Sequence, residues 1–240
     1  MFARRNLLLG LLLTLVACKG NPPAPAPAAS ETAPLAKKDE TISLTGAGAT
    51  FPYPLYSKWI SEYNKLNPSV KINYQSIGSG GGIRQITANT VDFGATDAPM
   101  KPEEAKQASA KLFHIPATIG AVVIAYNLPE VTGTLRLTPD VLVAIYAGKI
   151  RTWNDPKIKA DNADAKLPAK DISVVYRTDG SGTTAVFTDY LSKVNADWKE
   201  KVGVGKVVNW PTGLGAKGNE GVTGQVKTTP YTIGYIERAY

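Results

Sequence analysis

Three short loops rich in glycine, serine and threonine each lie between a predicted strand and a predicted helix. Their sequences are GAGATFPYPLY at 46–56, GSGGGIRQI at 78–86 and DGSGTTAVF at 179–187. A helix N-terminus offers free backbone N–H groups and the positive end of the helix dipole, and nearby hydroxyls add further donors. Three such ends together form a cradle suited to a tetrahedral oxyanion. The pattern therefore predicts anion binding, with phosphate as the first candidate.

The segments around these loops predict an α/β fold with mostly parallel strands. Strand-like runs alternate with helical apolar spacing along the chain, as in βαβ units. The predicted strands are TISLTGAG at 41–48, VKINYQSIG at 70–78, a strand and turn in VDFGATDAP at 91–99, HIPATIGAVVIAYN at 114–127, DISVVYR at 171–177 and YTIGYIERAY at 231–240. Ligands of open α/β sheets bind beyond the carboxyl ends of the strands, which is where the three loops are expected.

Apolar spacing also predicts which large side chains lie in the core. These are Trp59, Tyr63, Phe187 and Tyr190. Packing in the core is also expected for Trp153 and Trp210, with a place beside the binding cleft as the alternative. His114 is the only histidine, and its apolar neighbours predict a buried or half-buried strand position rather than a catalytic one. No His/Cys cluster is present in the sequence, so neither a metal site nor a cofactor is expected.

The N-terminus has the pattern of an export signal. Arg4 and Arg5 precede an apolar stretch that ends in LVAC at 15–18, which resembles a bacterial lipobox. We therefore expect a signal peptide over residues 1–17 and a lipid (palmitate) anchor on Cys18 that tethers the protein to a membrane. An ordinary signal peptide with an incidental cysteine is the alternative. Residues 18–40, rich in proline and alanine, are expected to form an extended linker.

Charge and motifs argue against nucleic-acid binding and against catalysis. The net charge is +7, and the basic residues are scattered rather than clustered. GSGTTA at 180–185 fits a dinucleotide-binding pattern, but its acidic partner would have to be Glu200, in a polar segment instead of at a strand end. No G-x-S-x-G frame surrounds Ser79 or Ser181, so a serine hydrolase is not expected either. We predict a protein that is not an enzyme.

Four motifs resemble one protein family over residues from about Ile42 to Tyr240. They are LTGAGATFPYPLYSKW at 44–59, VDFGATDAPM at 91–100, RTDGSGTT at 177–184 and WPTGLGAKGN at 210–219. In order and spacing they are similar to the substrate-binding lipoproteins of bacterial high-affinity phosphate ABC importers. The resemblance implies a periplasmic-binding-protein fold of the type II kind, in which two α/β lobes joined by hinge strands close on the anion.

The resemblance also implies a set of phosphate-binding residues. They are Ala49, Thr50, Phe51, Ser79, Asp97, Arg177, Asp179, Ser181, Gly182 and Thr183. The Arg177 guanidinium can bond two phosphate oxygens at once. Asp97 can accept a hydrogen bond from the proton that phosphate still carries at neutral pH, whereas sulfate has none to offer. Plainer alternatives remain: Thr50, Ser79 and Ser181 as helix caps, Asp97 as a turn residue, and Arg177 as a surface ion-pair partner.

From the resemblance we expect lobe 1 at residues 41–116, lobe 2 at 117–235 and a hinge strand returning toward lobe 1 at 236–240. Family members usually continue beyond this point, so lobe 1 is expected to be incomplete, with an open sheet edge and an uncovered apolar face.

The implied function is binding of inorganic phosphate by a monomer at the periplasmic or extracytoplasmic face, with delivery to an ABC permease. Two alternatives stay open. One is a receptor for another tetrahedral oxyanion, such as molybdate, tungstate or sulfate. The other is a truncated surface lipoprotein that binds nothing.

Overall fold

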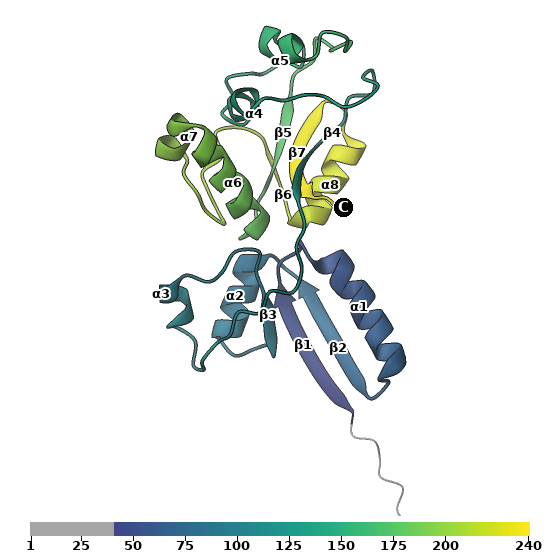
Figure 1. Ribbon diagram of the computed structural model, residues 1–240, viewed down its shortest axis with the longest axis vertical. Helices are drawn as coiled ribbons and strands as arrows, with labels where there is room; N and C mark the ends of the chain where they lie inside the picture. Colours follow the sequence, from purple (N-terminus) through teal and green to yellow (C-terminus); the bar gives the residue numbers. More distant parts are fainter. Residues whose placement is uncertain (1–40) are drawn as a thin grey trace, which may run out of the picture. The chain divides into compact units, whose positions relative to one another are not determined.

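The computed structural model describes residues 41–240, and the predicted signal peptide, Cys18 and the linker lie outside the described residues. Its first sheet contains β1 (Ile42–Gly48), β2 (Val70–Ser76) and β3 (Phe93–Ala95), in the order β2-β1-β3. All three strands are parallel, and β1 pairs with β2 along its whole length. Parallel neighbours need crossover connections. These are α1 (Tyr53–Leu66) and α2 (Ser79–Thr87), which lie beside the sheet in Figure 1.

The second sheet has four strands in the order β4-β7-β5-β6. They are β4 (Val122–Tyr126), β5 (Ser173–Arg177), β6 (Leu214–Ala216) and β7 (Thr232–Glu237). Only β4 runs antiparallel, against β7. The remaining helices are α3 (Pro102–Ala105), α4 (Pro139–Tyr146), α5 (Pro156–Asp161), α6 (Gly182–Val194), α7 (Ala196–Lys201) and α8 (Gly218–Thr228). The predicted α/β class with mostly parallel strands is confirmed.

The largest core cluster lies on one side of the second sheet. Aromatic rings dominate it: Tyr235 stacks on Phe187 with ring centroids 4.6 Å apart and on Trp210 at 5.5 Å. Trp153 is fully buried, and its Nε1 donates a hydrogen bond of 3.0 Å to the Tyr231 carbonyl. A smaller cluster, which includes Val175 of β5 and Val222 of α8, lies against this sheet as well. The predicted burial of Trp153 and Phe187 is confirmed, and Trp210 is half-buried and packs against the same cluster.

Three other aromatic residues predicted in the core are exposed instead. Trp59 and Tyr63 on α1 expose 47% and 45% of their surface, and Tyr190 on α6 exposes 42%. No residue of α1 is fully buried. Helical spacing shows which side chains share a face, but it does not show whether another layer covers that face. Among residues 41–240, no further layer packs over this side of α1.

The predicted strand at 114–127 is much shorter in the structure. Only Val122–Tyr126 forms a strand, and Ile115 and Ile119, which precede it, are 82% and 97% exposed. A strand needs a neighbour for its backbone hydrogen bonds, and within residues 41–240 no strand pairs with this stretch. The prediction of a buried His114 is wrong for the same reason: it is exposed, and its Nε2 accepts a hydrogen bond from the Met100 amide.

The chain after residue 235 continues in the second sheet. Ile236 and Glu237, predicted to begin a separate hinge strand, are the last residues of β7 and pair with Val123 and Val122 of β4.

Within residues 41–240, no helix has both the length and the apolar character that a membrane span requires.

One helix offers a direct test of the core assignment. We expect Phe187→Ala to lower the free energy of unfolding by about 3–5 kcal/mol, because it empties a space between Tyr146 and Tyr235. Tyr190→Ala on the same helix serves as the control and should change it by less than about 1 kcal/mol. Urea unfolding of both variants measures the difference. Equal losses would contradict the observed orientation of α6.

Candidate anion-binding site

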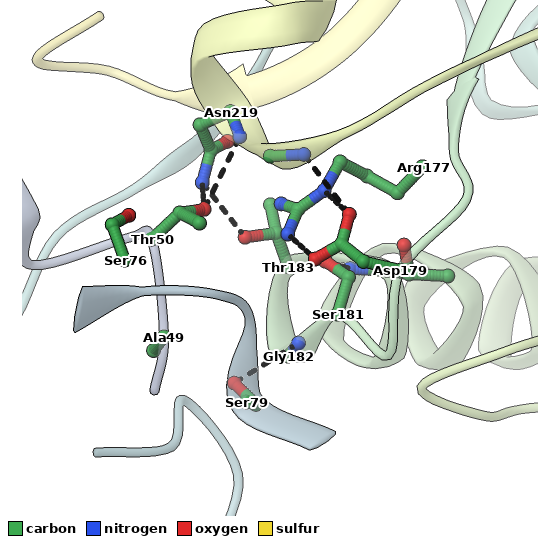
Figure 2. A network of polar contacts seen from close by, with 12 residues as sticks. Ala49, Thr50, Ser76, Ser79, Arg177, Asp179, Ser181, Gly182, Thr183 and Asn219 are labelled. Carbon is green, nitrogen blue, oxygen red and sulfur yellow. Dashed lines mark hydrogen bonds and ion pairs between the residues drawn. The ribbon is translucent and has the colours of Figure 1, made fainter. Parts of the chain in front are cut away.

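Several strands of the two sheets end at one polar cluster, shown in Figure 2. β1 ends at Gly48 just before Thr50, and β5 ends at Arg177 just before Asp179. The helices α2, α6 and α8 begin at Ser79, Gly182 and Gly218. Strand ends and helix N-termini therefore meet here, as ligand sites of α/β sheets require.

A buried ion pair occupies the centre of the cluster. Arg177 Nε and Nη2 bond the two carboxylate oxygens of Asp179 at 2.8 and 2.5 Å, and the Arg177 side chain is only 1% exposed. Asp179 Oδ1 also accepts a hydrogen bond from the Gly218 amide at 2.9 Å. Burial alone would raise the pKa of Asp179, but the Arg177 fork and the Gly218 amide hold it below its ordinary value.

The third guanidinium nitrogen of Arg177 is not used by this pair. Nη1 is buried and has no hydrogen-bond partner among residues 41–240. A buried cationic donor without an acceptor is expensive. An anionic ligand that accepted from Nη1 would remove that cost. The alternative in which Arg177 is a surface ion-pair partner is wrong, because the side chain is buried.

Loops from the two sheets touch at Ser79 and Gly182. Ser79 Oγ accepts from the Gly182 amide at 3.1 Å and from the Asp97 amide at 3.3 Å. A Cβ atom on Gly182 would lie 2.5 Å from both Ser79 Oγ and Asp97 Oδ2, so a side chain would force these loops apart. With two N–H groups on its lone pairs, the Ser79 hydroxyl keeps one hydrogen to donate.

Asp97 is the carboxylate of the cluster that no cation pairs directly. It accepts from Thr183 Oγ1 at 3.3 Å. Burial raises its pKa to about 6, although the Arg177 charge and the Thr183 hydrogen bonds partly offset this. The position therefore changes near neutral pH from a hydrogen-bond acceptor to a group that can also donate.

The helix-cap alternative holds for one of the three hydroxyl residues. Ser181 is the N-cap of α6, and its Oγ accepts from the Thr184 amide at 3.0 Å. By contrast, the N-cap positions of α1 and α2 are Pro52 and Gly78, and neither has a side-chain cap hydrogen bond. The hydroxyls of Thr50 and Ser79 are therefore not helix caps.

Two of the predicted residues lie at the edge of the cluster. The Ala49 amide donates to the Ala95 carbonyl at 2.9 Å, and its carbonyl accepts from Tyr74 Oη, so both groups bond within the first sheet. Phe51 is half-buried and lines a cavity together with Asp97 and Tyr56. The eight other predicted residues lie in or directly beside the cluster.

Asn219 is a site residue that sequence reasoning missed. It is fully buried at the start of α8 and bonds both Thr50 and Thr183. The motif WPTGLGAKGN ends on this residue. Because no helix is predicted after the motif, the sequence provides no reason to place Asn219 in the site. Tyr240 also reaches the cluster, where its hydroxyl donates to the Thr50 carbonyl at 2.5 Å. In residues 41–240, no three His, Cys, Asp or Glu side chains are grouped so that they could hold a metal ion.

Comparison with known families identifies the fold. A family model described as a PBP superfamily domain matches residues 23–240. The chain belongs to the PBP superfamily. Two solved structures share the α/β periplasmic-binding-protein fold. The high-affinity periplasmic phosphate-binding protein PfluDING, bound with phosphate, aligns with a TM-score of 0.63 at 25% identity over 81% of this chain and 56% of its own. A phosphate-bound structure from Clostridium perfringens gives 0.60 at 23% identity over 82% and 71%.

Curated relatives confirm the resemblance to phosphate-binding proteins. The phosphate-binding protein PstS of Pasteurella multocida is 57% identical over 199 residues, which cover 82% of this chain and 57% of that protein. PstS of Haemophilus influenzae is 55% identical over 82% of this chain and 59% of its own length. This PBP-superfamily chain thus spans less than two thirds of these relatives.

The raised pKa of Asp97 gives a testable pH dependence of stability. The folded protein holds this proton more tightly than the unfolded chain, because the pKa rises from 3.8 to about 6. Stability should therefore fall as pH rises through this interval. We expect Asp97→Asn, without added anion, to raise the free energy of unfolding by about 1–3 kcal/mol at pH 7.5 and by much less at pH 4.

Thermal unfolding at both pH values measures the effect. Asp164→Asn, at an exposed position, is the matched control and should shift the melting temperature little at either pH. A stabilisation by Asp97→Asn that is equal at both pH values would contradict the raised pKa.

Proposed function

We propose that this protein binds inorganic phosphate outside the cytoplasm and delivers it to the permease of an ABC importer. The observation that carries the proposal is Arg177 Nη1, a buried cationic donor with no partner among residues 41–240. The Ser79 hydroxyl, in the same polar cluster, keeps a hydrogen to donate, since both of its lone pairs face amides. Such a set of donors favours a ligand rich in acceptor oxygens.

Asp97 narrows the choice of anion. With Asp97 and Asp179 ionised and Arg177 charged, these three groups together carry a net charge of −1, so a fully ionised dianion is repelled. A ligand that brings a proton can donate it to Asp97 Oδ2 instead. Phosphate retains a proton at neutral pH, whereas sulfate, molybdate and tungstate do not. Asp97 therefore favours phosphate over the other tetrahedral oxyanions.

The relatives support the same conclusion. Two proteins that are 55–57% identical over most of this chain are named as phosphate-binding proteins. These names describe binding, and this agrees with a role in transport instead of catalysis. The permease partner follows from the family resemblance. The LVAC sequence at 15–18 further supports a lipid anchor on Cys18 that would hold the protein at the membrane's outer face.

Calorimetric titration of the full chain with phosphate tests the proposal. We expect Arg177→Ala to weaken phosphate binding by about 2–4 kcal/mol, as truncation of one partner in a buried charge pair does. Arg177→Lys should recover part of this, because it keeps the charge but lacks the planar fork that holds Asp179. Arg136→Ala removes an exposed guanidinium elsewhere in the chain and controls for net charge. Unchanged binding in Arg177→Ala would remove Arg177 from the site.

Sulfate competition against labelled phosphate tests the role of Asp97. At pH 7.5 we expect sulfate to compete poorly with the unmodified protein and measurably with Asp97→Asn, because the repelling charge is gone. Lowering the pH through about 6 protonates Asp97, so sulfate should then begin to compete with the unmodified protein too. The turn-residue alternative for Asp97 would stand if pH and substitution both left competition unchanged.

A further inference from the structure

The Asn219 side chain links three separate parts of the structure at the candidate site. Its side chain is fully buried and bonds three partners that come from β7, the first loop and α6. We propose that Asn219 is a positioning residue that sets the direction of the hydrogen bonds at Thr50 and Thr183, so that the Thr50 hydroxyl can only donate to a ligand. This inference rests on the proposed binding of phosphate.

The orientation of the Asn219 amide is determined by β7. The Glu237 backbone N–H lies 3.0 Å from Oδ1, and a backbone amide can only donate. The atom that faces it must therefore be the side-chain oxygen. The amino group then points to the other side, where Nδ2 lies 2.7 Å from Thr50 Oγ1 and 3.3 Å from Thr183 Oγ1. Both Nδ2 hydrogens are used.

The Thr50 hydroxyl consequently has only its hydrogen left for a further hydrogen bond. Its oxygen accepts from Asn219 Nδ2 and also from the Asn219 backbone amide at 3.1 Å. A hydroxyl has two lone pairs and one hydrogen, so both lone pairs are occupied. No acceptor for the remaining hydrogen is recorded within residues 41–240. Thr50 can therefore bind a ligand only as a donor.

Thr183 is directed in the same way. Its hydroxyl accepts from Asn219 Nδ2 and donates to Asp97 Oδ2 at 3.3 Å. The one Thr183 hydrogen is therefore engaged by Asp97, so of the two threonines only Thr50 keeps a hydrogen for a ligand. A ligand that offered only hydrogens, such as an ammonium group, would leave the Thr50 donor facing another donor. Selectivity for acceptor oxygens therefore depends on a residue that need not touch the ligand.

Asn219→Asp reverses this direction with almost no change of shape. One carboxylate oxygen would still accept from the Glu237 amide, but the other would accept from the Thr50 hydroxyl and divert its hydrogen from the ligand. We expect phosphate binding at pH 7.5 to weaken about 10- to 100-fold, as the loss of one hydrogen bond to a charged ligand implies. At pH 5 the protonated carboxyl can donate again, so the deficit relative to the unmodified protein should shrink at least about tenfold.

The surrounding charges favour this recovery. The acidic residues around this end of α8 are Asp97, Asp179, Glu220 and Glu237, and the basic ones are Arg177, which pairs with Asp179, and the exposed Lys217. Negative charge therefore outweighs positive charge here, and a new carboxyl at 219 should hold its proton well. Asn162→Asp is the matched control, because Asn162 is a buried asparagine elsewhere whose Nδ2 also donates to two oxygens. Its pH profile of phosphate binding, measured by calorimetry, should match that of the unmodified protein.

Two results overturn the inference: unweakened binding by Asn219→Asp at pH 7.5, or a deficit that persists undiminished at pH 5. If the unmodified protein fails to bind phosphate, the proposed function fails separately. If that happens, or if Asn219→Asp does not fold, amide hydrogen exchange of the Thr50→Val variant, measured without anion, tests whether Asn219 is bonded to Thr50. Loss of the Thr50 acceptor should speed exchange of the Asn219 backbone amide at least about tenfold. An unchanged exchange rate would show that Asn219 does not donate to Thr50.

Discussion

The cost of burying the Arg177 guanidinium is the constraint on which the rest of the site depends. A buried charge is tolerated only when it is paired and hydrogen-bonded. Asp179 supplies the pair, and the Gly218 amide at the start of α8 holds Asp179 in place. Strand β5, its following loop and α8 are thereby tied together around one cation. Because the fork uses only Nε and Nη2, Nη1 is left without a hydrogen-bond partner among residues 41–240 and is available to the proposed ligand.

The directions of the hydrogen bonds around this charged centre determine which groups of a ligand it could accept. Amides occupy the lone pairs of Ser79 and Thr50, so both hydroxyls present hydrogens. Asp97 presents the opposite character, an acceptor whose pKa lies near neutrality because it is buried. A protonated oxyanion satisfies donors and acceptor together. Charge alone would attract many anions, but in the proposed function this division between donors and one acceptor would favour phosphate over fully ionised anions of the same shape.

Much of this could be predicted from the amino-acid sequence alone. The α/β class follows from the alternation of strand and helix patterns, and the three glycine loops mark helix starts because glycine and hydroxyl residues act locally. Motif resemblance named Arg177, Asp179, Ser79 and Thr183 before any geometry was known, and the structure places them in one cluster. These features depend on neighbouring residues in the chain or on short motifs, so the sequence by itself determined them.

Only the tertiary structure decided features that depend on which surfaces meet. Trp59 and Tyr63 share a helix face that no layer within residues 41–240 covers, and Ile115 and Ile119 lie in a stretch that finds no strand to pair with. Asn219 acquires its role because β7 and the first loop approach it from distant parts of the chain. The pKa of Asp97 likewise depends on burial. Hydrophobic burial, pairing and desolvation are non-local, and a one-dimensional pattern does not encode them.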